Sequence, residues 1–420
     1  MRRDTLNTLG RTGVLGLGCV LAMTACGGSG GSDDQDGPVV FWDTSGPGES
    51  AVFRDLAEGC AASGGFEVAV EQVAFDQALN NFKNAAQGGQ GPDVLRAEVA
   101  WVAQLAHNGL IQDLAGTGLD DQGDFLATPW SSTQFDGATY AVPQVTDTLA
   151  LLYNRELLDE AGVEPPTSWE ELLDIAPDLG GDSAFFVNND GYYALPFIYS
   201  AGGDLLDVEN QTIVVNSDEA VAGLGTARAL LDEGAARTAQ DPGNSYGNMK
   251  AAFASGEVAM IVDGPWAVAD LLDGAAFQDP ENLGVAPLPG PADGDGNGPV
   301  GGHDYVIRQG SERTDDAVSL IECMSGVEAQ TTVAVELGLL PTRESVYEDP
   351  EVAEHPVVSA FSAAVERAHP RPWIAEGNEL FDPLKIGYAD VLAGNLSPAE
   401  AAEQVATAYQ DTVVPDYTIG

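Results

Sequence analysis

The chain has 420 residues, of which 66 are acidic, 16 are basic and 44% are hydrophobic, and its formal net charge is −50. This length predicts two domains, and the hydrophobic share is large enough to fill their cores, so the acidity belongs to the surface. Such a surface repels nucleic acid and anionic lipid, which excludes both as electrostatic partners.

The first residues predict export and a membrane anchor. A basic start precedes the apolar run "GVLGLGCVLAM" (13–23), which is too short to span a bilayer comfortably and is typical of a signal peptide, here residues 1–25. The stretch "MTAC" ends at Cys26 and resembles a bacterial lipoprotein cleavage box, and a flexible tether covers 26–37. We expect a lipid on Cys26 that holds the protein at the outer face of the cell membrane. Ordinary secretion is the alternative.

Strand and helix patterns alternate through the first part of the mature chain. They predict strands at 39–42, 66–73 and 92–95 and helices at 49–62, 76–87 and 98–109. Such alternation is typical of an α/β protein with a mostly parallel sheet covered by helices on both faces.

A second set of elements begins after residue 147, and the Gly/Pro-rich stretch 287–302 is its clearest linker. Serines at helix starts and prolines in first turns are the main signals here. The predicted elements are a strand at 148–154, a helix from a capping box at Ser168 through Pro177, a helix at 218–233 capped by Ser217, a strand at 257–262, a helix begun by Pro265, a strand at 305–308, two short helices up to Leu337, and helices from Pro350, the last capped by Ser397 and Pro398.

Four cysteines allow one internal disulfide. Cys19 leaves with the signal peptide and Cys26 takes the lipid, so Cys60 and Cys323 remain as a pair in an oxidising compartment. We predict that they are bonded, with two separately buried thiols as the alternative.

The sequence contains no motif of a catalytic site. Its four His residues lack metal-ligand spacing, and a nucleophile elbow, a Walker loop and a dinucleotide fingerprint are all missing. The stretch "DGDGNGPVGGHD" (293–304) matches a calcium-loop pattern with Asp at the last position in place of Glu. We interpret it as a solvated turn, with a calcium site as the alternative, and expect no enzyme activity, cofactor or metal.

A large indole stands at a strand-to-helix turn. In "AMIVDGPWA" a buried strand ends at Asp263, and Trp266 follows the turn at once. Ligands of α/β folds lie at the carboxyl ends of strands, where such turns present their side chains. We therefore interpret Trp266 as a flat surface on which a ligand stacks, with core packing as the alternative.

Four stretches of the chain carry a family resemblance. They are "YAVPQVTDTLALLYNRELLDEAGVEPPTSWEELL" (140–173), "GNMKAAFASGEVAMIVDGPWA" (247–267), "GVAPLPGP" followed by "VGGHDYVI" (284–307), and "LGLLPTRESVY" (337–347). In this order, and spanning nearly the whole mature chain, they closely resemble family 1 extracellular solute-binding proteins. These are the sugar receptors of ABC importers, and the maltose/maltodextrin-binding proteins are their best-known members.

The resemblance implies a type II, maltose-binding-protein-like fold, in which two α/β lobes close on a ligand at a hinge. Lobe 1 would hold 38–146 and 303–348, and lobe 2 would hold 147–302 and 349–420. Cys60 and Cys323 would both lie on helices of lobe 1. The ligand would be a small carbohydrate, and the partners would be the transmembrane subunits of an ABC permease, with the protein acting as a monomer.

The resemblance also implies contact residues. Trp266 falls on the family's stacking Trp, Asp190 and Tyr192 on an acidic and aromatic pair, Asp147 on a ligand-binding Glu, Phe381 on a second stacking position, and Lys385 on an Arg. Where the chain departs from the maltose pattern, we expect substitutes. These are Glu98 and Trp101 after "GPDV", and Ser45 and Glu49 in "WDTSGPGE". Trp373 and His303 are further candidates for contact with the ligand.

Pyranose rings suit such residues because their C–H faces stack on aromatic rings and their hydroxyls donate to carboxylates. The sequence therefore predicts a carbohydrate receptor. The alternatives are a ferric-ion receptor using the adjacent Tyr192 and Tyr193, a secreted glycoside hydrolase using two carboxylates, and a receptor that feeds a sensor kinase.

Overall fold

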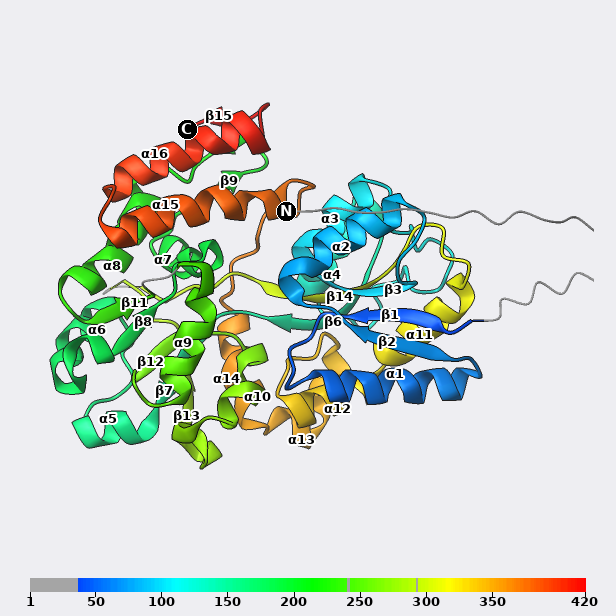
Figure 1. Cartoon of the computed structure of the whole chain (residues 1–420), viewed down its shortest axis with the longest axis horizontal. Coiled ribbons are helices and arrows are strands. Elements are labelled where there is room, and N and C mark those ends of the chain that lie inside the picture. The colour runs from blue at the N-terminus through cyan, green and yellow to red at the C-terminus, as the bar shows by residue number, and fades with distance from the viewer. Residues whose placement is uncertain (1–36, 240–241, 292–293) are drawn as a thin grey trace, which may run out of the picture. The chain divides into compact units, whose positions relative to one another are not determined.

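Two five-stranded sheets, each with its own helices, form most of the described part of the chain (Figure 1). This computed structural model describes residues 37–239, 242–291 and 294–420. The predicted signal peptide, Cys26, the tether up to residue 36 and Asp293 lie outside the described residues. No helix within them is both long and apolar enough to cross a membrane.

The first sheet has the strand order β2-β1-β3-β14-β6. β1 is parallel to β2 and β3, but β14 is antiparallel to both of its neighbours, β3 and β6. The sheet is therefore mostly parallel, as predicted, with β14 as its one strand of opposite direction, because the chain reaches β14 from the second sheet and enters the first sheet at the opposite end. The strands are β1 (Val39–Asp43), β2 (Val68–Gln72), β3 (Val94–Glu98), β6 (Val142–Asp147) and β14 (Gly301–Ile307).

The second sheet has the order β11-β8-β12-β7-β13 and the same mixture of directions. β8 is parallel to β11 and β12, whereas β7 is antiparallel to β12 and β13. Its strands are β7 (Ala150–Asn154), β8 (Phe185–Val187), β11 (Ala236–Thr238), β12 (Met260–Asp263) and β13 (Leu283–Ala286). Short strands outside the two sheets are β4 (Gln134–Phe135), β5 (Ala138–Thr139), β9 (Leu206–Asp207), β10 (Thr212–Ile213) and β15 (Thr418–Ile419).

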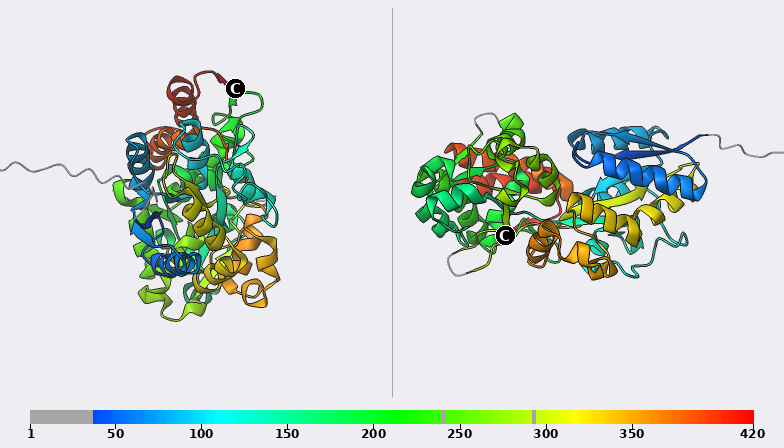
Figure 2. Two further views of the ribbon diagram at one scale, coloured as in Figure 1. Left: turned by 90° about the vertical axis from the view of Figure 1, so that its right-hand side faces the viewer. Right: turned by 90° about the horizontal axis from the view of Figure 1, so that it is seen from below.

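Helices cover the sheets (Figures 1 and 2). Those before residue 148 and those from 314 to 337 follow strands of the first sheet, and most others belong to the second. They are α1 (Ser50–Gly64), α2 (Phe75–Gln87), α3 (Val99–His107), α4 (Ala127–Ser132), α5 (Arg155–Ala161), α6 (Trp169–Ile175), α7 (Leu195–Ser200), α8 (Asp218–Asp232), α9 (Ser245–Ala254), α10 (Val268–Leu272), α11 (Thr314–Met324), α12 (Val327–Leu337), α13 (Pro350–Ala353), α14 (Pro356–Val365), α15 (Phe381–Ala393) and α16 (Pro398–Ala408).

Alternate residues of the first sheet fill separate cores on its two faces, as the period of a strand requires. Phe41, Tyr305 and Ile307 pack with α1 and α11, whereas Leu95 and Val306 pack with α2 and α3. The second sheet has one larger core that also takes in α15 and α16. Each sheet therefore stabilises its own set of helices.

Helix caps follow the sequence signals, with one difference. The side chain of Ser217 accepts from the amide of Ala220, and Ser397 forms a complete capping box with Glu400. Ser168 accepts from the amide of Glu171, but the Glu171 carboxylate accepts from the amide and hydroxyl of the residue before Ser168. The predicted box at Ser168 is therefore half formed.

The carboxyl edges of the two sheets adjoin the chain segment that joins them. In the first sheet β3 ends at Glu98, and β6, which runs in the same direction, ends at Asp147. Two residues separate β6 from β7, whose first residue, Ala150, pairs with Asp263 at the end of β12. This short connection brings the two carboxyl edges together, and such edges are where α/β sheets bind ligands.

Cys60 of α1 and Cys323 of α11 form a disulfide across 263 residues of sequence, with their Cα atoms 5.8 Å apart. The two helices lie side by side on the first sheet, α1 in blue and α11 in yellow (Figure 2). The bond ties together two segments that reach this sheet from distant parts of the chain.

Removing this disulfide is expected to lower the free energy of unfolding by about 3–5 kcal/mol, because a long loop gains conformational freedom in the unfolded chain. Urea unfolding of the Cys60→Ser, Cys323→Ser double variant without reductant measures the loss. A reductant should bring the wild type to the same midpoint and leave the variant unchanged. An equal midpoint for wild type and variant without reductant would show that the bond adds no stability.

Candidate ligand-binding site

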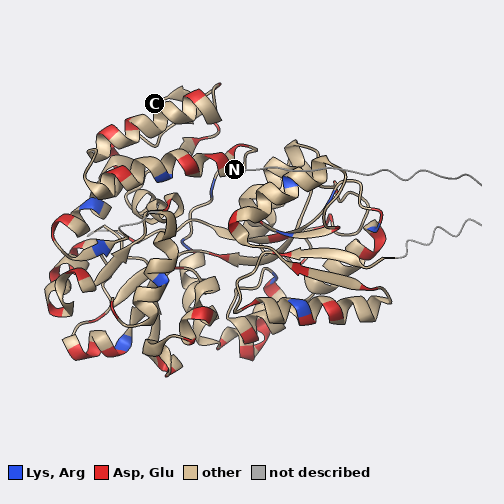
Figure 3. Ribbon diagram, viewed as in Figure 1, with Lys and Arg blue, Asp and Glu red and all other residues tan. Residues whose placement is uncertain are grey.

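Carboxylates line the carboxyl edge of the first sheet. Asp43, Glu98 and Asp147 are the last residues of β1, β3 and β6. β14 runs the other way and places its first residues at the same edge, where Gly301 pairs with Asp147 and His303 with Glu98. Elsewhere Asp and Glu are spread along the helices of both sheets (Figure 3). The carboxylates at the carboxyl edge differ from those on the helices because they are largely buried.

Asp147 is 6% exposed at the end of β6. Burial raises the pKa of Asp147 to about 7, although Arg371 lowers it and Glu98 raises it. A methyl group on Gly301 would lie 2.1 Å from Asp147 Oδ1 and 3.0 Å from Tyr192 Oη. The glycine therefore lets a carboxylate of the first sheet meet a phenol from the second.

Aromatic side chains gather at the carboxyl edge of the second sheet. Trp266 lies in a 3₁₀ turn (Pro265–Ala267) after β12, and Tyr192 lies in another (Gly191–Ala194) after β8. The ring centroids of Tyr192 and Trp266 are 6.4 Å apart, and those of Tyr192 and Phe381 are 6.1 Å apart. Trp266 is half-buried and its Nε1 donates to Tyr246 Oη at 3.1 Å. The indole is thus partly packed against its neighbours and partly exposed, and it lies at the strand-to-helix turn that the sequence predicted.

Arg371 connects the carboxylate edge to the aromatic group. It lies in the segment between α14 and α15, and its guanidinium donates to Glu98 of β3 and, through Nε, to the carbonyl of Val300. The guanidinium carbon is 5.6, 5.5 and 5.9 Å from the ring centroids of Tyr192, Trp373 and Phe381. Burial alone would lower the pKa of Arg371, but the Glu98 carboxylate raises it above its usual value.

Glu49 and Ser45 lie in the loop after β1. Ser45 is 6% exposed, and its hydroxyl donates to Asp43 Oδ2 at 2.6 Å. Glu49 precedes α1 and is 3% exposed; one of its oxygens accepts from the Gly46 amide, and Oε1 has no partner among the described residues. Burial raises the pKa of Glu49 to about 7, against an opposing effect of Arg96. The unpartnered oxygen of Glu49 is an available acceptor.

Stability is expected to fall as the pH rises from about 5 to 8. Burial raises the pKa of Asp147, Glu49 and Asp263 to about 7 in the folded state, above their ordinary values near 4. A raised pKa contributes stability that is present below the unfolded pKa and is lost as the pH passes the folded pKa. The urea midpoint of Asp147→Asn and Glu49→Gln should therefore depend less on pH than that of the wild type. Parallel pH profiles would contradict the assignment.

Asp190 and Lys385 form an ion pair next to the aromatic group. Lys385 Nζ lies 2.9 Å from Asp190 Oδ2, and both side chains are about 40% exposed. Asp190 also accepts from the Tyr192 amide and so fixes the start of the turn that carries this ring. The pair neutralises its own charge and leaves both groups open to solvent.

Trp101, predicted as a ligand contact, is buried in the structure. It is 4% exposed, lies in the core under α2 and α3, and is stacked by Phe75 with ring centroids 5.1 Å apart. Phe75, at the start of α2, is 48% exposed. The helical position of Trp101 points inward, and Phe75 is the aromatic side chain that remains available.

His303 and Trp373 complete the candidates. Both ring nitrogens of His303 are buried and have no hydrogen-bond partner within the described residues. Burial, together with Arg96 and Arg371, lowers the pKa of His303 well below its usual value, so the ring is neutral. Trp373 is half-buried, and the guanidinium of Arg371 lies over its ring. His303 is thus a neutral side chain that can both donate and accept.

The described residues show no group of three or more His, Cys, Asp or Glu arranged to hold a metal. In the suggested calcium loop, Asp295 pairs with Arg367 at 3.0 Å, whereas Asp304 lies in β14 and accepts from Ser132. These two carboxylates have separate partners and do not converge. Burial also raises the pKa of Tyr192 and of Tyr193 well above the usual value, which works against phenolate ligation of ferric ion.

The comparison with protein families identifies the class of protein that carries this site. Residues 55–360 match the family described as bacterial extracellular solute-binding protein. The chain belongs to this family. Family membership makes the protein a solute-binding receptor and not an enzyme, and it places the receptor outside the cytoplasm.

Three relatives show how far the similarity extends. The GacH receptor of Streptomyces glaucescens GLA.O, solved unliganded and with acarbose or an acarbose homolog, is 44% identical; the match covers 91% of this chain and 99% of that one, with a TM-score of 0.87. A maltotriose-binding protein of Pyrococcus abyssi is 27% identical over 80% of this chain and 73% of its own length. A maltooligosaccharide ABC transporter solute-binding lipoprotein of Streptococcus pneumoniae is 22% identical over 94% of each chain. The likeness to the first confirms the predicted two-lobe α/β fold.

Sequence reasoning missed three residues that this receptor places in or beside the site: Arg371, Phe75 and Tyr246. Phe75 had a usable signal, because "VAFDQ" puts an aromatic residue at a strand-to-helix turn, as at Trp266. Arg371 had none, since its partner Glu98 is 273 residues away in sequence. Tyr246 is recognisable only through its hydrogen bond with Trp266.

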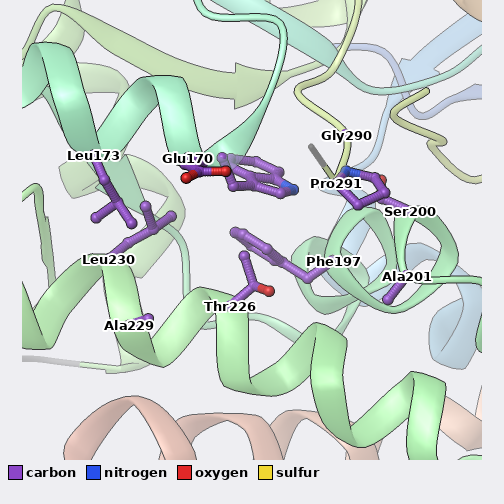
Figure 4. Close-up of a pocket in the computed structure, with 11 residues that line it drawn as sticks. Glu170, Leu173, Phe197, Ser200, Ala201, Thr226, Ala229, Leu230, Gly290 and Pro291 are labelled. Carbon is purple, nitrogen blue, oxygen red and sulfur yellow. The ribbon is translucent and has the colours of Figure 1, made fainter. Parts of the chain in front are cut away.

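The receptor also has a surface cavity of about 260 Å³ away from this site (Figure 4). It is lined by residues of α6, α7 and α8 and by the chain at Gly290, with Leu173 and Leu230 at one side and Phe197 near its centre. None of the residues predicted to contact a ligand lines it. The cavity is therefore separate from the candidate site.

Proposed function

We propose that the receptor binds a maltose-type or related oligosaccharide between its two lobes and delivers it to the transmembrane subunits of an ABC importer. The observation that supports this most strongly is the arrangement of the two carboxyl edges. Carboxylates on the first sheet lie opposite Trp266, Tyr192 and Phe381 on the second.

The chemistry of this arrangement suits a sugar. Aromatic rings stack on the C–H faces of pyranose rings, and carboxylates accept strong hydrogen bonds from the hydroxyls at their rims. Glu49 Oε1 is a buried acceptor without a partner among the described residues, and Asp147 is a buried carboxylate at the end of β6. The names of the relatives, which concern acarbose, maltotriose and maltooligosaccharides, support the same class of ligand.

Closure of the two lobes is the proposed mechanism. We propose lobe 1 at 38–146 and 303–348 and lobe 2 at 147–302 and 349–420, which the membership of the two sheets supports. Among the described residues, two side-chain hydrogen bonds would then cross between the lobes: Arg371 with Glu98, and Gln104 Nε2 with Glu379 Oε1 at 2.9 Å. A ligand that contacts both lobes in the closed form shifts the balance towards closure. The permease would recognise that closed form.

We also propose a lipid on Cys26 and a monomeric receptor. The lipoprotein box in the sequence supports the anchor, and so does the name of the Streptococcus pneumoniae relative, which is a lipoprotein. A mass increase of the membrane-bound protein that is lost in Cys26→Ser, together with release of that variant into the medium, would test it. Release of both forms would indicate ordinary secretion.

A thermal-shift screen tests the proposed function. Glucose, maltose, maltotriose, maltotetraose and acarbose are compared with amino acids and ferric ion, because a ligand that binds the folded state raises the melting temperature by mass action. We expect an oligosaccharide to give the largest shift. A shift with amino acids or ferric ion and none with any saccharide would overturn the proposal, and release of reducing sugar would indicate a hydrolase.

A further inference from the structure

The carboxyl edge of the first sheet has more buried carboxylates than ion pairs to neutralise them. Glu98 is paired with Arg371, and Asp190 with Lys385. Glu49 and Asp147 are each more than nine-tenths buried, and neither forms an ion pair within the described residues. Glu49 and Asp147 are therefore desolvated acids at the edge that no ion pair neutralises; Asp43, which is also buried there, accepts from the amide and hydroxyl of Ser45.

The remaining cation at the edge is engaged elsewhere. Arg96 of β3 is 2% exposed; its Nε donates to Gln144 Oε1 at 2.9 Å, and its guanidinium carbon lies 4.9 Å from the ring centroid of Phe53. Arg96 lowers the pKa of Glu49, and Arg371 followed by Arg96 lowers that of Asp147, yet burial prevails and raises both pKa values to about 7. Arg96 therefore moderates the charge of the two acids without neutralising it.

Other charges near the two acids add to the imbalance. Asp43 and Asp270 raise the pKa of Glu49, and Glu98 raises that of Asp147. Each acid is also near the second sheet, Glu49 through Asp270 of α10 and Asp147 through the Tyr192 hydroxyl. A ligand between the sheets would meet both carboxylates.

A neutral hydroxyl compensates only part of the cost of burying such a carboxylate, because it donates a hydrogen bond but carries no positive charge. A basic nitrogen does both: it takes up the proton and forms a charge-assisted hydrogen bond with a buried carboxylate. We propose that Glu49 and Asp147 make this receptor select oligosaccharides that contain a basic nitrogen over neutral glucose oligosaccharides of the same length. The proposal rests on the proposed function, since it concerns the same site.

The test compares two four-ring ligands: acarbose, in which a secondary amine joins two rings, and maltotetraose, which is neutral. Isothermal titration calorimetry of the purified full-length receptor measures both affinities. We expect acarbose to bind at least about 10-fold more tightly, the effect of one charge-assisted contact. Maltotetraose binding as tightly as acarbose would overturn the inference while leaving the carbohydrate function intact. Binding of neither would overturn the proposed function itself.

Variants that remove a carboxylate charge but keep the shape of the side chain show whether the preference for acarbose comes from its basic nitrogen. Other differences between the two ligands would affect the wild type and these variants equally. Asp147→Asn and Glu49→Gln should each lower the preference for acarbose about 5- to 10-fold. Asp232→Asn is the matched control, because it removes a carboxylate of α8 outside the site that has Arg228 as partner, and it should leave the preference unchanged. Equal losses for both ligands in Asp147→Asn and Glu49→Gln would overturn the inference.

Folding of the variants is checked by urea unfolding, and none should be less stable than the wild type at pH 8, because each replaces a buried charge or an exposed pair. The two acids lie on different elements, the loop before α1 and the end of β6, so the preference can be measured with either variant.

Discussion

Replacing Trp266 with alanine is expected to weaken oligosaccharide binding by about 30- to 100-fold, because a stacked sugar face loses roughly 2–3 kcal/mol of contact. The unliganded receptor should lose much less stability, about 1–2 kcal/mol, since the indole is half-buried and donates one hydrogen bond to Tyr246. Calorimetry measures the first effect and urea unfolding the second. Trp266→Phe should keep most of the affinity, because it retains a flat ring.

Trp169 provides the matched control for this experiment. It is 6% exposed, stacks on Phe197 with ring centroids 4.6 Å apart, and belongs to the core of the second sheet. Trp169→Ala should therefore cost about 3–5 kcal/mol of stability, while the folded fraction binds ligand normally. If Trp266→Ala behaved like Trp169→Ala, with a large stability loss and normal affinity, Trp266 would be a core residue and the site assignment would be wrong.

Replacing Arg371 with methionine is expected to reduce both stability and binding. Its side chain is 5% exposed and that of Glu98 is 13% exposed, so the change leaves a buried carboxylate without its counter-charge. Breaking a buried pair from one side costs about 3–5 kcal/mol. Affinity should fall as well, because Arg371 packs against Tyr192, Trp373 and Phe381 and fixes their positions.

A second substitution separates the two effects. Arg371→Met with Glu98→Gln removes both charges, and most of the lost stability should return because no unpaired charge remains. Ligand affinity should stay low in the double variant, since the guanidinium that links the first sheet to the aromatic rings is still missing. Recovery of affinity together with stability would show that Arg371 acts through folding alone and has no part in positioning the site.

Local sequence patterns predicted many of the elements and one of the main site residues. The strands at β1, β3 and β7, the helices α1, α2 and α8, and the caps at Ser217 and Ser397 are confirmed because period, capping and proline signals act within a few residues. Trp266 was identified by the same local reasoning, as an aromatic residue at the mouth of a strand-to-helix turn. Its predicted role in binding still awaits the experiment above.

The candidates differ in how far their position depends on distant residues. The burial of Trp101 could not be predicted, because it depends on how α3 packs against the sheet and α2, where Phe75 stacks on the indole. Glu49 and Asp147 were predicted as ligand contacts, which stays a prediction, but their burial and the unpartnered oxygen of Glu49 are visible only when the neighbouring strands are in place. Arg371 could not be found at all without its partner.

The sequence by itself determined where helices and strands begin, that the surface is strongly acidic, and that this chain resembles solute-binding receptors, because these properties depend on neighbouring residues, on composition or on direct similarity. The tertiary structure decided three other things. It set the antiparallel direction of β14, it brought Glu98 and Arg371 together, and it buried Asp147 at the end of β6. The physical reason is the same in each case: burial and charge pairing depend on contacts between residues far apart in the chain, which exist only after the two sheets have formed.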